Sequence, residues 1–548
     1  MTDRTPHTRS LDDALNRLYQ EWDEQVTAPR LIYIGIREHL GEQERPSLLS
    51  LSSGLIGRAT ATWGLPISQT TVGQIAAAIA IAIVVALYLA FLGPNINDAE
   101  PEFVPIAEPT ATTETVVGIR GSDGVGHPVF PSFGNGGYDV SHYDLDLNID
   151  PVAPTLGGVA VLTMRATESL VSFNLDFAGP AISAVEVNDE PAVFIRQENE
   201  LIIEPATVIP NGSVFTVRVT YGGTPEPLII PDFDFPLGWT RLRDTIVVLG
   251  PGMAWYPANQ TPSDRATFSM RFTVPNPLVV SASGILTATI DNGDTSTYVW
   301  ELAEPSGGLF GPIVFTISDS VPESIAGPDG LAIDISFPPE TSEFIREQFD
   351  VAGEIVELLI DLFGPFPYES FGITYLPEDH PLGNYGEPQR LVAFYADELD
   401  LAFGFAQQWF GGSITPASTA DTWLTLGFTT YAQLLWVEHV DGARAYDARA
   451  RAHRGRIGDN TRPPAVATSP VDILDFANRF RGALTLYTLR QELGDDDFFE
   501  VLRTFTDRFK HSAASTADFI AVAEEVSQQD LAEFFDAWLY TEAVPPPG

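Results

Sequence analysis

Residues 72–92, VGQIAAAIAIAIVVALYLAFL, form an uninterrupted run of 21 residues without a charged side chain. A helix of this length crosses a hydrocarbon layer of about 30 Å, and apolar residues all round it leave no polar face for water. A buried core helix is the alternative, and the long preceding segment disfavours a cleaved signal peptide. The sequence therefore predicts one transmembrane helix at residues 72–93, with the rest of the chain folding on either side of it.

The charges that flank this run differ in sign. Seven arginines precede it, from Arg4 to Arg58, whereas five acidic residues follow it before Arg120 appears. Arginine excess marks the side of a membrane helix that stays in the cytoplasm. We therefore expect a single-pass protein of the cytoplasmic membrane, with its N-terminus inside and residues 94–548 outside.

The composition argues against nucleic-acid binding and excludes cysteine chemistry. The chain has 74 acidic and 29 basic residues, for a net charge of -45, and such a field repels nucleic acid. Cysteine is absent, which rules out disulfides and cysteine-ligated zinc. Nucleic acid is therefore not an expected partner.

Composition and hydrophobic periodicity along the chain predict an α+β, multidomain fold. Residues 1–71 form a partly helical cytosolic tail, in which an amphipathic helix within residues 10–40 packs inside the tail or binds a cytosolic partner. Residues 94–137 are rich in Pro, Thr and acids and read as a stalk. Short alternating runs between turn residues predict an antiparallel β domain at 138–326, and long helical patterns follow at 327–542.

Two short motifs carry the most specific signal, QWFG at residues 408–411 and WLTLGF at residues 423–428. A catalytic zinc needs three protein ligands, and two of them are supplied economically by His at i and i+4 of one helix. The two motifs and their spacing resemble the membrane alanyl aminopeptidase family, peptidase family M1 of the gluzincins. The resemblance covers roughly residues 138–540, and it implies a thermolysin-like catalytic domain with zinc as cofactor.

When the chain is aligned on these motifs, the positions of the family's zinc ligands and general base hold residues of other types. Phe403 and Gln407 stand at the two histidine positions, Leu426 at the third-ligand position and Gly404 at the general base. Arg479 replaces a tyrosine that stabilises the transition state in the family. We therefore expect that the chain keeps the fold of the family. We expect it to bind no metal or other cofactor and to have no catalytic residues. Carbon at Phe403 and Leu426 would fill the former ion site without burying unpaired polar groups.

A loop reading GNYGEP lies where the family binds the amino terminus of its substrate. Glu387 aligns with the glutamate that binds that amino group, and Gly383, Asn384, Tyr385 and Gly386 precede it. The backbone of this stretch is suited to pair with an extended peptide. The alternative is that Glu387 is one loop carboxylate among many.

These observations predict a membrane-anchored, catalytically inactive aminopeptidase-like protein with a peptide-binding or scaffolding role. The alternative is an active metallo-aminopeptidase with an unconventional metal site, for which His380 is the histidine placed to reach the cleft. A purely structural surface protein with a filled cleft is a third reading.

Overall fold

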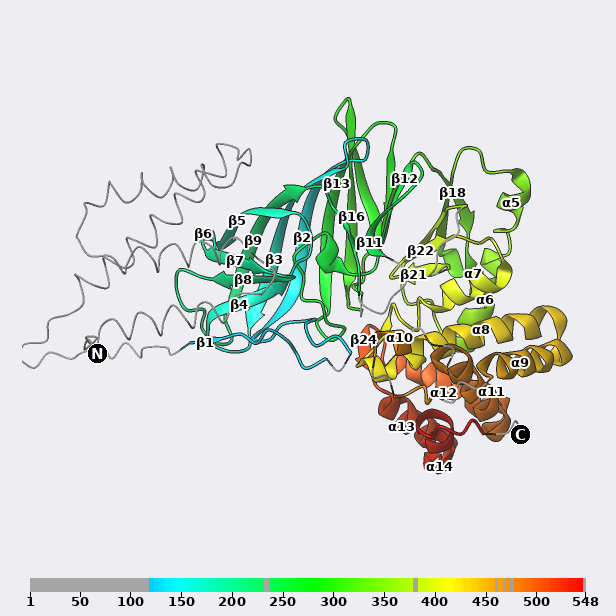
Figure 1. Ribbon diagram of the computed structural model, residues 1–548. Coiled ribbons are helices and arrows are strands. Elements are labelled where there is room, and N and C mark those ends of the chain that lie inside the picture. Colours follow the sequence, from blue (N-terminus) through cyan, green and yellow to red (C-terminus); the bar gives the residue numbers. More distant parts are fainter. Residues whose placement is uncertain are drawn as a thin grey trace, which may run out of the picture. The chain divides into compact units, whose positions relative to one another are not determined.

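A computed structural model describes residues 118–545, except 128, 231–235, 309, 378–382, 459–461, 467–468, 474 and 476 (Figure 1). These residues belong to one compact unit, Thr112–Gly548. The predicted cytosolic tail at 1–71, its partner segment at 10–40 and the first part of the stalk lie outside the described residues, as does His380. The predicted localisation depends on these residues, which the structure does not describe, and it stays a prediction.

One part of the expected fold class was wrong, namely the single membrane-spanning helix. No helix in the described part of the chain is long and apolar enough to cross a membrane. The longest of them, α8 (Trp423–Asp441), ends in Glu438, His439 and Asp441, and it packs within a protein core. Residues 72–93, for which the span was predicted, lie outside the described residues.

The first half of the described chain is built on a large β-sheet. Alternating apolar and polar residues give its long strands one buried side, as in β2 (Tyr138–Asp150), where Val140, Leu145 and Leu147 are fully buried. Neighbours are antiparallel except β2 and β13, which run parallel. The sheet order is β15 (Ile285–Asp291), β16 (Thr295–Ser306), β13 (Ala266–Pro275), β2 (Tyr138–Asp150), β3 (Thr155–Ala166), β9 (Val214–Gly223), β5 (Ala181–Val187) and β6 (Glu190–Pro191).

Two smaller sheets complete this half and share one hydrophobic core with the large sheet. Leu145 of the large sheet, Phe173 of β4 (Leu170–Asp176) and Phe315 of β17 (Phe315–Ser318) are each fully buried in it. One sheet has the order β1 (Ile119–Arg120), β4 (Leu170–Asp176), β8 (Glu200–Glu204) and β7 (Val193–Gln197). The other has the order β10 (Pro227–Leu228), β11 (Leu237–Leu242), β12 (Thr245–Leu249), β17 (Phe315–Ser318) and β14 (Val279–Ala282).

The second half combines a mixed five-stranded sheet with helices (Figure 1). The sheet order is β18 (Val321–Ala326), β19 (Ala332–Phe337), β20 (Ser370–Tyr375), β22 (Arg390–Ala393) and β21 (Tyr385–Glu387), which places β21 at an edge. The helices besides α8 are α5 (Glu343–Glu347), α6 (Ala352–Phe363), α7 (Glu398–Ala406), α9 (Ala443–Ile457), α10 (Pro470–Ile473), α11 (Gly482–Leu493), α12 (Asp495–Arg508), α13 (Thr516–Ser527) and α14 (Ala532–Phe535). Two further strands, β23 (Ile414–Pro416) and β24 (Ser512–Ala514), form a parallel pair.

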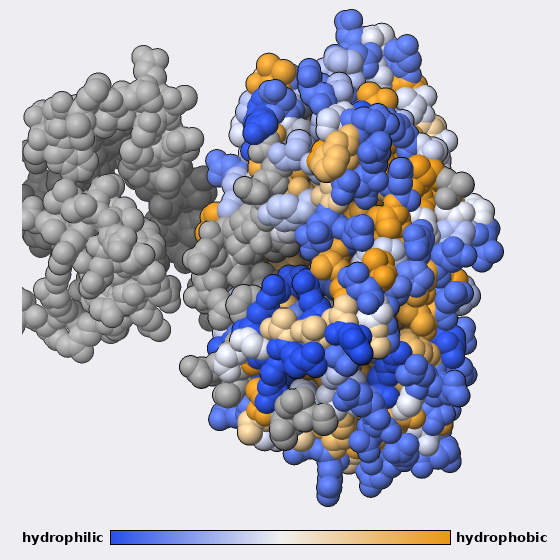
Figure 2. Space-filling view, turned by 90° about the vertical axis from the view of Figure 1, so that its right-hand side faces the viewer, coloured by the Kyte–Doolittle hydropathy of each residue, from blue (hydrophilic) through white to orange (hydrophobic). Residues whose placement is uncertain are grey.

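A second hydrophobic core lies between these helices and the mixed sheet. Helices α8 and α11 approach closely at two glycines, because a Cβ on Gly427 would lie 2.9 Å from the Gly482 Cα. On the face shown in Figure 2, hydrophobic residues lie scattered among hydrophilic ones, as expected when the apolar faces are used internally.

Two arginines, one buried and one partly buried, join the two halves. Arg390 of β22 donates from Nε to the Ala282 carbonyl of β14 over 2.9 Å, and its guanidinium carbon lies 5.0 Å from the Trp300 ring centre. Arg265 donates to the Thr415 hydroxyl over 2.6 Å. The cavity described below lies between the halves that these contacts hold together.

Candidate functional site

Helix α7 carries three of the positions singled out in the sequence. Its N-cap is Asp397, whose side chain accepts a hydrogen bond from the Leu399 N–H over 2.9 Å. The helix then runs to Ala406 with its last six residues buried. Phe403, Gly404 and Gln407 therefore sit at the buried C-terminal end of α7, where a metal-binding helix would present its ligands.

Close packing explains the glycine at the former general-base position. A Cβ on Gly404 would lie 2.5 Å from Leu391 Cδ1 and 2.8 Å from Cδ2, so Leu391 of β22 occupies the space of the missing side chain. Gly386 of β21 is similarly tight, because a Cβ there would lie 2.8 Å from Gln407 Oε1 and 3.2 Å from the Gly404 carbonyl oxygen. The sheet edge therefore lies almost directly on α7.

Two glutamines at the end of α7 bind the backbone of this sheet edge. Gln407 accepts a hydrogen bond on Oε1 from the Gly386 N–H over 2.9 Å. Gln408 accepts from the Gln389 N–H over 2.8 Å and donates from Nε2 to the Glu387 carbonyl over 3.0 Å. The residue at the second histidine position thus has a structural role, and two backbone groups of β21 are already hydrogen-bonded to side chains.

The loop that precedes β21 is also fixed by hydrogen bonds between a side chain and the backbone. Asn384, which is buried, accepts from the Phe394 and Tyr395 N–H groups and donates to the Tyr395 carbonyl. Gly383 has a φ of +65°, a conformation that favours glycine. The sequence predicted peptide contacts for Gly383–Glu387, but the structure uses much of this backbone and the Asn384 side chain to fix the loop.

A cavity of about 130 Å³ opens beside these residues. Glu387, Gln407 and Leu426 line it together with Tyr385 and Gly386, and residues of the β half such as Pro262 and Phe310 close another side. Phe403 and Arg479 are not among its lining residues. The structure therefore brings Glu387, Gln407 and Leu426 to one cavity, and the side chains at the predicted ion site do not fill it.

Glu387 is the acidic group of this cavity. It is 9% exposed, and its side chain accepts a hydrogen bond from the Tyr385 hydroxyl over 2.8 Å. Burial raises the pKa of Glu387 to about 8, and the Tyr385 hydrogen bond offsets part of that rise. No cationic side chain among the described residues forms an ion pair with this carboxyl group, which therefore suits a cationic ligand group.

Arg479 covers Phe403, which lies one helical turn before Gln407 on α7. Its guanidinium carbon lies 4.9 Å from the centre of the Phe403 ring, a cation–π contact. Arg479 belongs to a π-helical turn, η4 (Ala477–Arg481), which leads into α11, and such turns are frequent at functional sites. Phe403 is 8% exposed beneath it.

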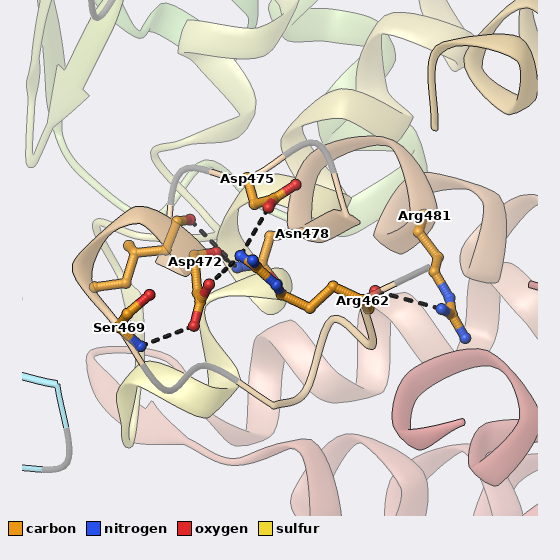
Figure 3. Close-up of polar contacts among 7 residues, drawn as sticks. Arg462, Ser469, Asp472, Asp475, Asn478 and Arg481 are labelled. Carbon is orange, nitrogen blue, oxygen red and sulfur yellow. Dashed lines mark hydrogen bonds and ion pairs between the residues drawn. The ribbon is translucent and has the colours of Figure 1, made fainter. Parts of the chain in front are cut away.

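The segment before η4 is anchored by the polar contacts shown in Figure 3. Arg462 pairs with Asp472 and Asp475, and Asn478 donates to the Asp472 carbonyl over 2.5 Å. Arg481, which is fully buried, donates to the Trp538 carbonyl over 2.8 Å. These contacts fix η4 and hence the position of Arg479.

The residues at the former metal position do not fit a zinc ion. Phe403 and Leu426 have no lone pair to donate, and the Gln407 carbonyl oxygen already accepts a backbone hydrogen bond. Within the described residues, no group of three or more His, Asp or Glu side chains could hold a metal ion. No chemical step through a metal follows from this donor set.

Known proteins that are similar to this chain are aminopeptidases and other proteins of peptidase family M1. The model for the peptidase family M1 domain matches residues 401–538, a range that includes α7, α8 and η4. Aminopeptidase M1-B of Oryza sativa subsp. japonica is 23% identical over 321 residues, which cover 53% of this chain and 36% of that protein. Leucine aminopeptidase 2 of Vanderwaltozyma polyspora is 21% identical over 454 residues, or 75% of this chain and 67% of that protein. The match to the rice protein thus spans only about a third of its length.

Solved structures resemble both halves of the described chain. A two-domain M1 zinc metallopeptidase mutant bound to L-tryptophan has a TM-score of 0.70 and 27% identity, covering 77% of this chain and 99% of that chain. A mutant M1 zinc metallopeptidase from Deinococcus radiodurans, bound to a Tyr-Ser-Ala substrate, has the same TM-score and coverage with 28% identity. The architecture built above is therefore shared with zinc metallopeptidases.

Proposed function

This chain is a member of peptidase family M1, and from that premise we propose that it has lost zinc-dependent hydrolysis and uses its cavity to bind the amino end of peptides. One observation carries the proposal: the cavity, which Gln407 and Leu426 also line, keeps a buried carboxyl group at Glu387 that forms no ion pair with a described residue. Phe403 contacts Arg479 and Gln407 accepts a hydrogen bond from Gly386, so these two side chains have protein partners in place of a metal.

The carboxyl group of Glu387 supplies the recognition. An α-ammonium group that enters the cavity replaces the missing positive partner of this carboxyl group, and the low local dielectric strengthens the pair. Because the pKa of Glu387 is about 8 in the free protein, most of the carboxyl is protonated at pH 7. Binding of an ammonium group lowers that pKa, and the proton is released to the buffer.

Isothermal titration calorimetry tests the binding half of the proposal. The probe is the tripeptide Tyr-Ser-Ala, the substrate seen in the Deinococcus structure, and its N-acetylated form is the matched control. We expect the free peptide to bind about tenfold or more tightly than the acetylated one, since a charged hydrogen bond is worth about 1.5–3 kcal/mol. The observed enthalpy should also change with the ionisation enthalpy of the buffer at pH 7.

Glu387→Gln supplies the second control for this titration. The variant keeps the size of the side chain but cannot accept the ammonium charge, so the preference for the free amino terminus and the proton release should both disappear. Equal affinity for the free and acetylated peptides in the unmodified protein would overturn the binding proposal. Absence of binding by either peptide would favour the structural surface protein.

A hydrolysis assay tests the loss of activity. The full chain, supplemented with zinc, is incubated with aminoacyl fluorogenic substrates in the presence and absence of a chelator. We expect no chelator-sensitive release of the fluorophore. Chelator-sensitive release by the purified protein would establish the alternative, an active metallo-aminopeptidase with an unconventional metal site.

A further inference from the structure

Near Arg479, which contacts Phe403, several basic side chains converge. Arg449, His453 and Arg456 recur at i, i+4 and i+7 and therefore share one face of α9. Helix α9 packs against η4, which contributes Arg479. We call these four residues the arginine cluster.

The ring of Phe480 shows how close three members of this cluster lie. The His453 ring centre is 4.8 Å from the Phe480 ring centre. The guanidinium carbons of Arg456 and Arg479 are 5.2 Å and 5.6 Å from the same centre. Three basic groups from two helical elements thus surround one aromatic ring.

Polar atoms of the cluster are buried without partners among the described residues. They are the Nε atoms of Arg449 and Arg479 and both ring nitrogens of His453. His453 is 1% exposed. A buried donor that makes no hydrogen bond costs about 1–3 kcal/mol, so such groups call for an acceptor that the polypeptide itself does not provide.

The positive charge around Arg479 is only partly compensated. Asp400 is the carboxylate that acts electrostatically on Arg479, opposed by Arg449 and Arg456. Burial, together with the charges of the three arginines, lowers the pKa of His453 to about 3. Arg479 is therefore acted on by one carboxylate and two guanidinium groups, within a chain whose net charge is -45.

We propose that the arginine cluster binds an oxyanion, namely the carboxylate or phosphate group of a small ligand. Arginine Nε–H groups and an imidazole N–H are the donors that such oxygens accept most strongly. Arg456 is exposed and marks where the cluster meets solvent, whereas Arg449 and His453 form its inner end. Arg479, which also covers Phe403, connects this site with the former metal position.

The test is a titration of the full chain with inorganic phosphate and, separately, with acetate, each against sodium chloride at equal ionic strength. Melting temperature and calorimetry are the readouts. We expect saturable stabilisation by at least one oxyanion beyond that of chloride, and the stronger of the two identifies the phosphate or the carboxylate class. In Arg449→Gln and Arg479→Gln the affinity should fall about tenfold or more, which corresponds to one charged hydrogen bond.

Arg444→Gln is the matched control. Arg444 is exposed on the same helix, so its replacement removes the same charge without touching the cluster, and screening should keep the affinity within about twofold. Absence of saturable binding by both phosphate and acetate in the unmodified protein would overturn the proposal, as would an equal loss in Arg444→Gln and Arg449→Gln. Because this site does not involve the peptide cavity, a failed oxyanion titration leaves the Tyr-Ser-Ala result untouched, and the reverse also holds.

Discussion

At Gly404 the lack of a side chain is a packing requirement. In open helix positions alanine is favoured over glycine by about 1 kcal/mol, yet here a Cβ would lie 2.5 Å from Leu391. We therefore expect Gly404→Ala to destabilise the protein by about 1–3 kcal/mol through overpacking, as measured by urea unfolding. Replacement by glutamate, the residue of the family's general base, should cost more.

Gly455 provides the comparison for this substitution. It lies in α9, and a Cβ added there would meet nothing within 4 Å, so Gly455→Ala should stabilise the protein by up to about 1 kcal/mol. Leu391→Ala in the Gly404→Ala background should recover part of the loss by making room. If Gly404→Ala proved as stable as the unmodified protein, Leu391 would not be the reason for the glycine.

At the scale of elements, Gln407, which the family resemblance places at the second histidine position, stabilises the contact between α7 and β21. Gln407→Ala removes the acceptor of the Gly386 N–H and leaves that partly buried donor unpaired. The expected cost is about 1–3 kcal/mol, measured by urea unfolding. Gln491 is exposed on α11, and Gln491→Ala should change the stability by less than about 0.5 kcal/mol. Equal effects of the two changes would contradict the structural role of Gln407.

Sequence patterns predicted some elements well and missed one that matters. Within the helical region predicted at 327–542, the apolar pattern favours helices at residues 399–410 and 422–440. These correspond to α7 (Glu398–Ala406) and α8 (Trp423–Asp441), because apolar periodicity and the motif register agree there. Helix α9 was not predicted. Its sequence, ARAYDARARAHRGRI, buries only four residues, which is too weak an apolar stripe to detect.

The candidate site shows the same limit. Local sequence predicted the helices themselves, and the structure has Phe403 in α7, Gln407 at its C-cap and Leu426 in α8. The bond from Gly386 to Gln407 and the contact of Gly404 with Leu391 join residues distant in sequence. No local pattern encodes such contacts, so the sequence could not show that Gln407 binds the sheet edge or that a cavity remains beside Leu426.

At the scale of the whole molecule, buried carboxyl groups should make stability depend on pH. Burial raises the pKa of Asp176 and Glu387 to about 8 and that of Glu200 and Asp264 to about 7. Their pKa values in the unfolded chain are about 4, so between about pH 4 and pH 8 the folded state binds more protons. Stability should therefore be greatest near the lower end and fall as the pH rises toward 8.

Urea unfolding at pH 5.5 and pH 8.0 measures this dependence. Asp176→Asn should flatten it, because the variant has no proton to lose at that position. Repulsion within an acidic chain acts in the same direction and is screened by salt, so both pH values are measured at high ionic strength. A protein that becomes more stable between pH 5.5 and pH 8.0 would contradict the assignment of these raised pKa values.

The central claim is that the M1 fold persists here without its metal, and zinc stoichiometry tests it most directly. The full-length protein is dialysed against micromolar zinc, then against metal-free buffer, and zinc per chain is measured by elemental analysis. We predict far less than one zinc per chain, with no change in melting temperature on addition of a chelator. One tightly held zinc per chain, located by anomalous diffraction beside Gln407 and Leu426, would contradict the account.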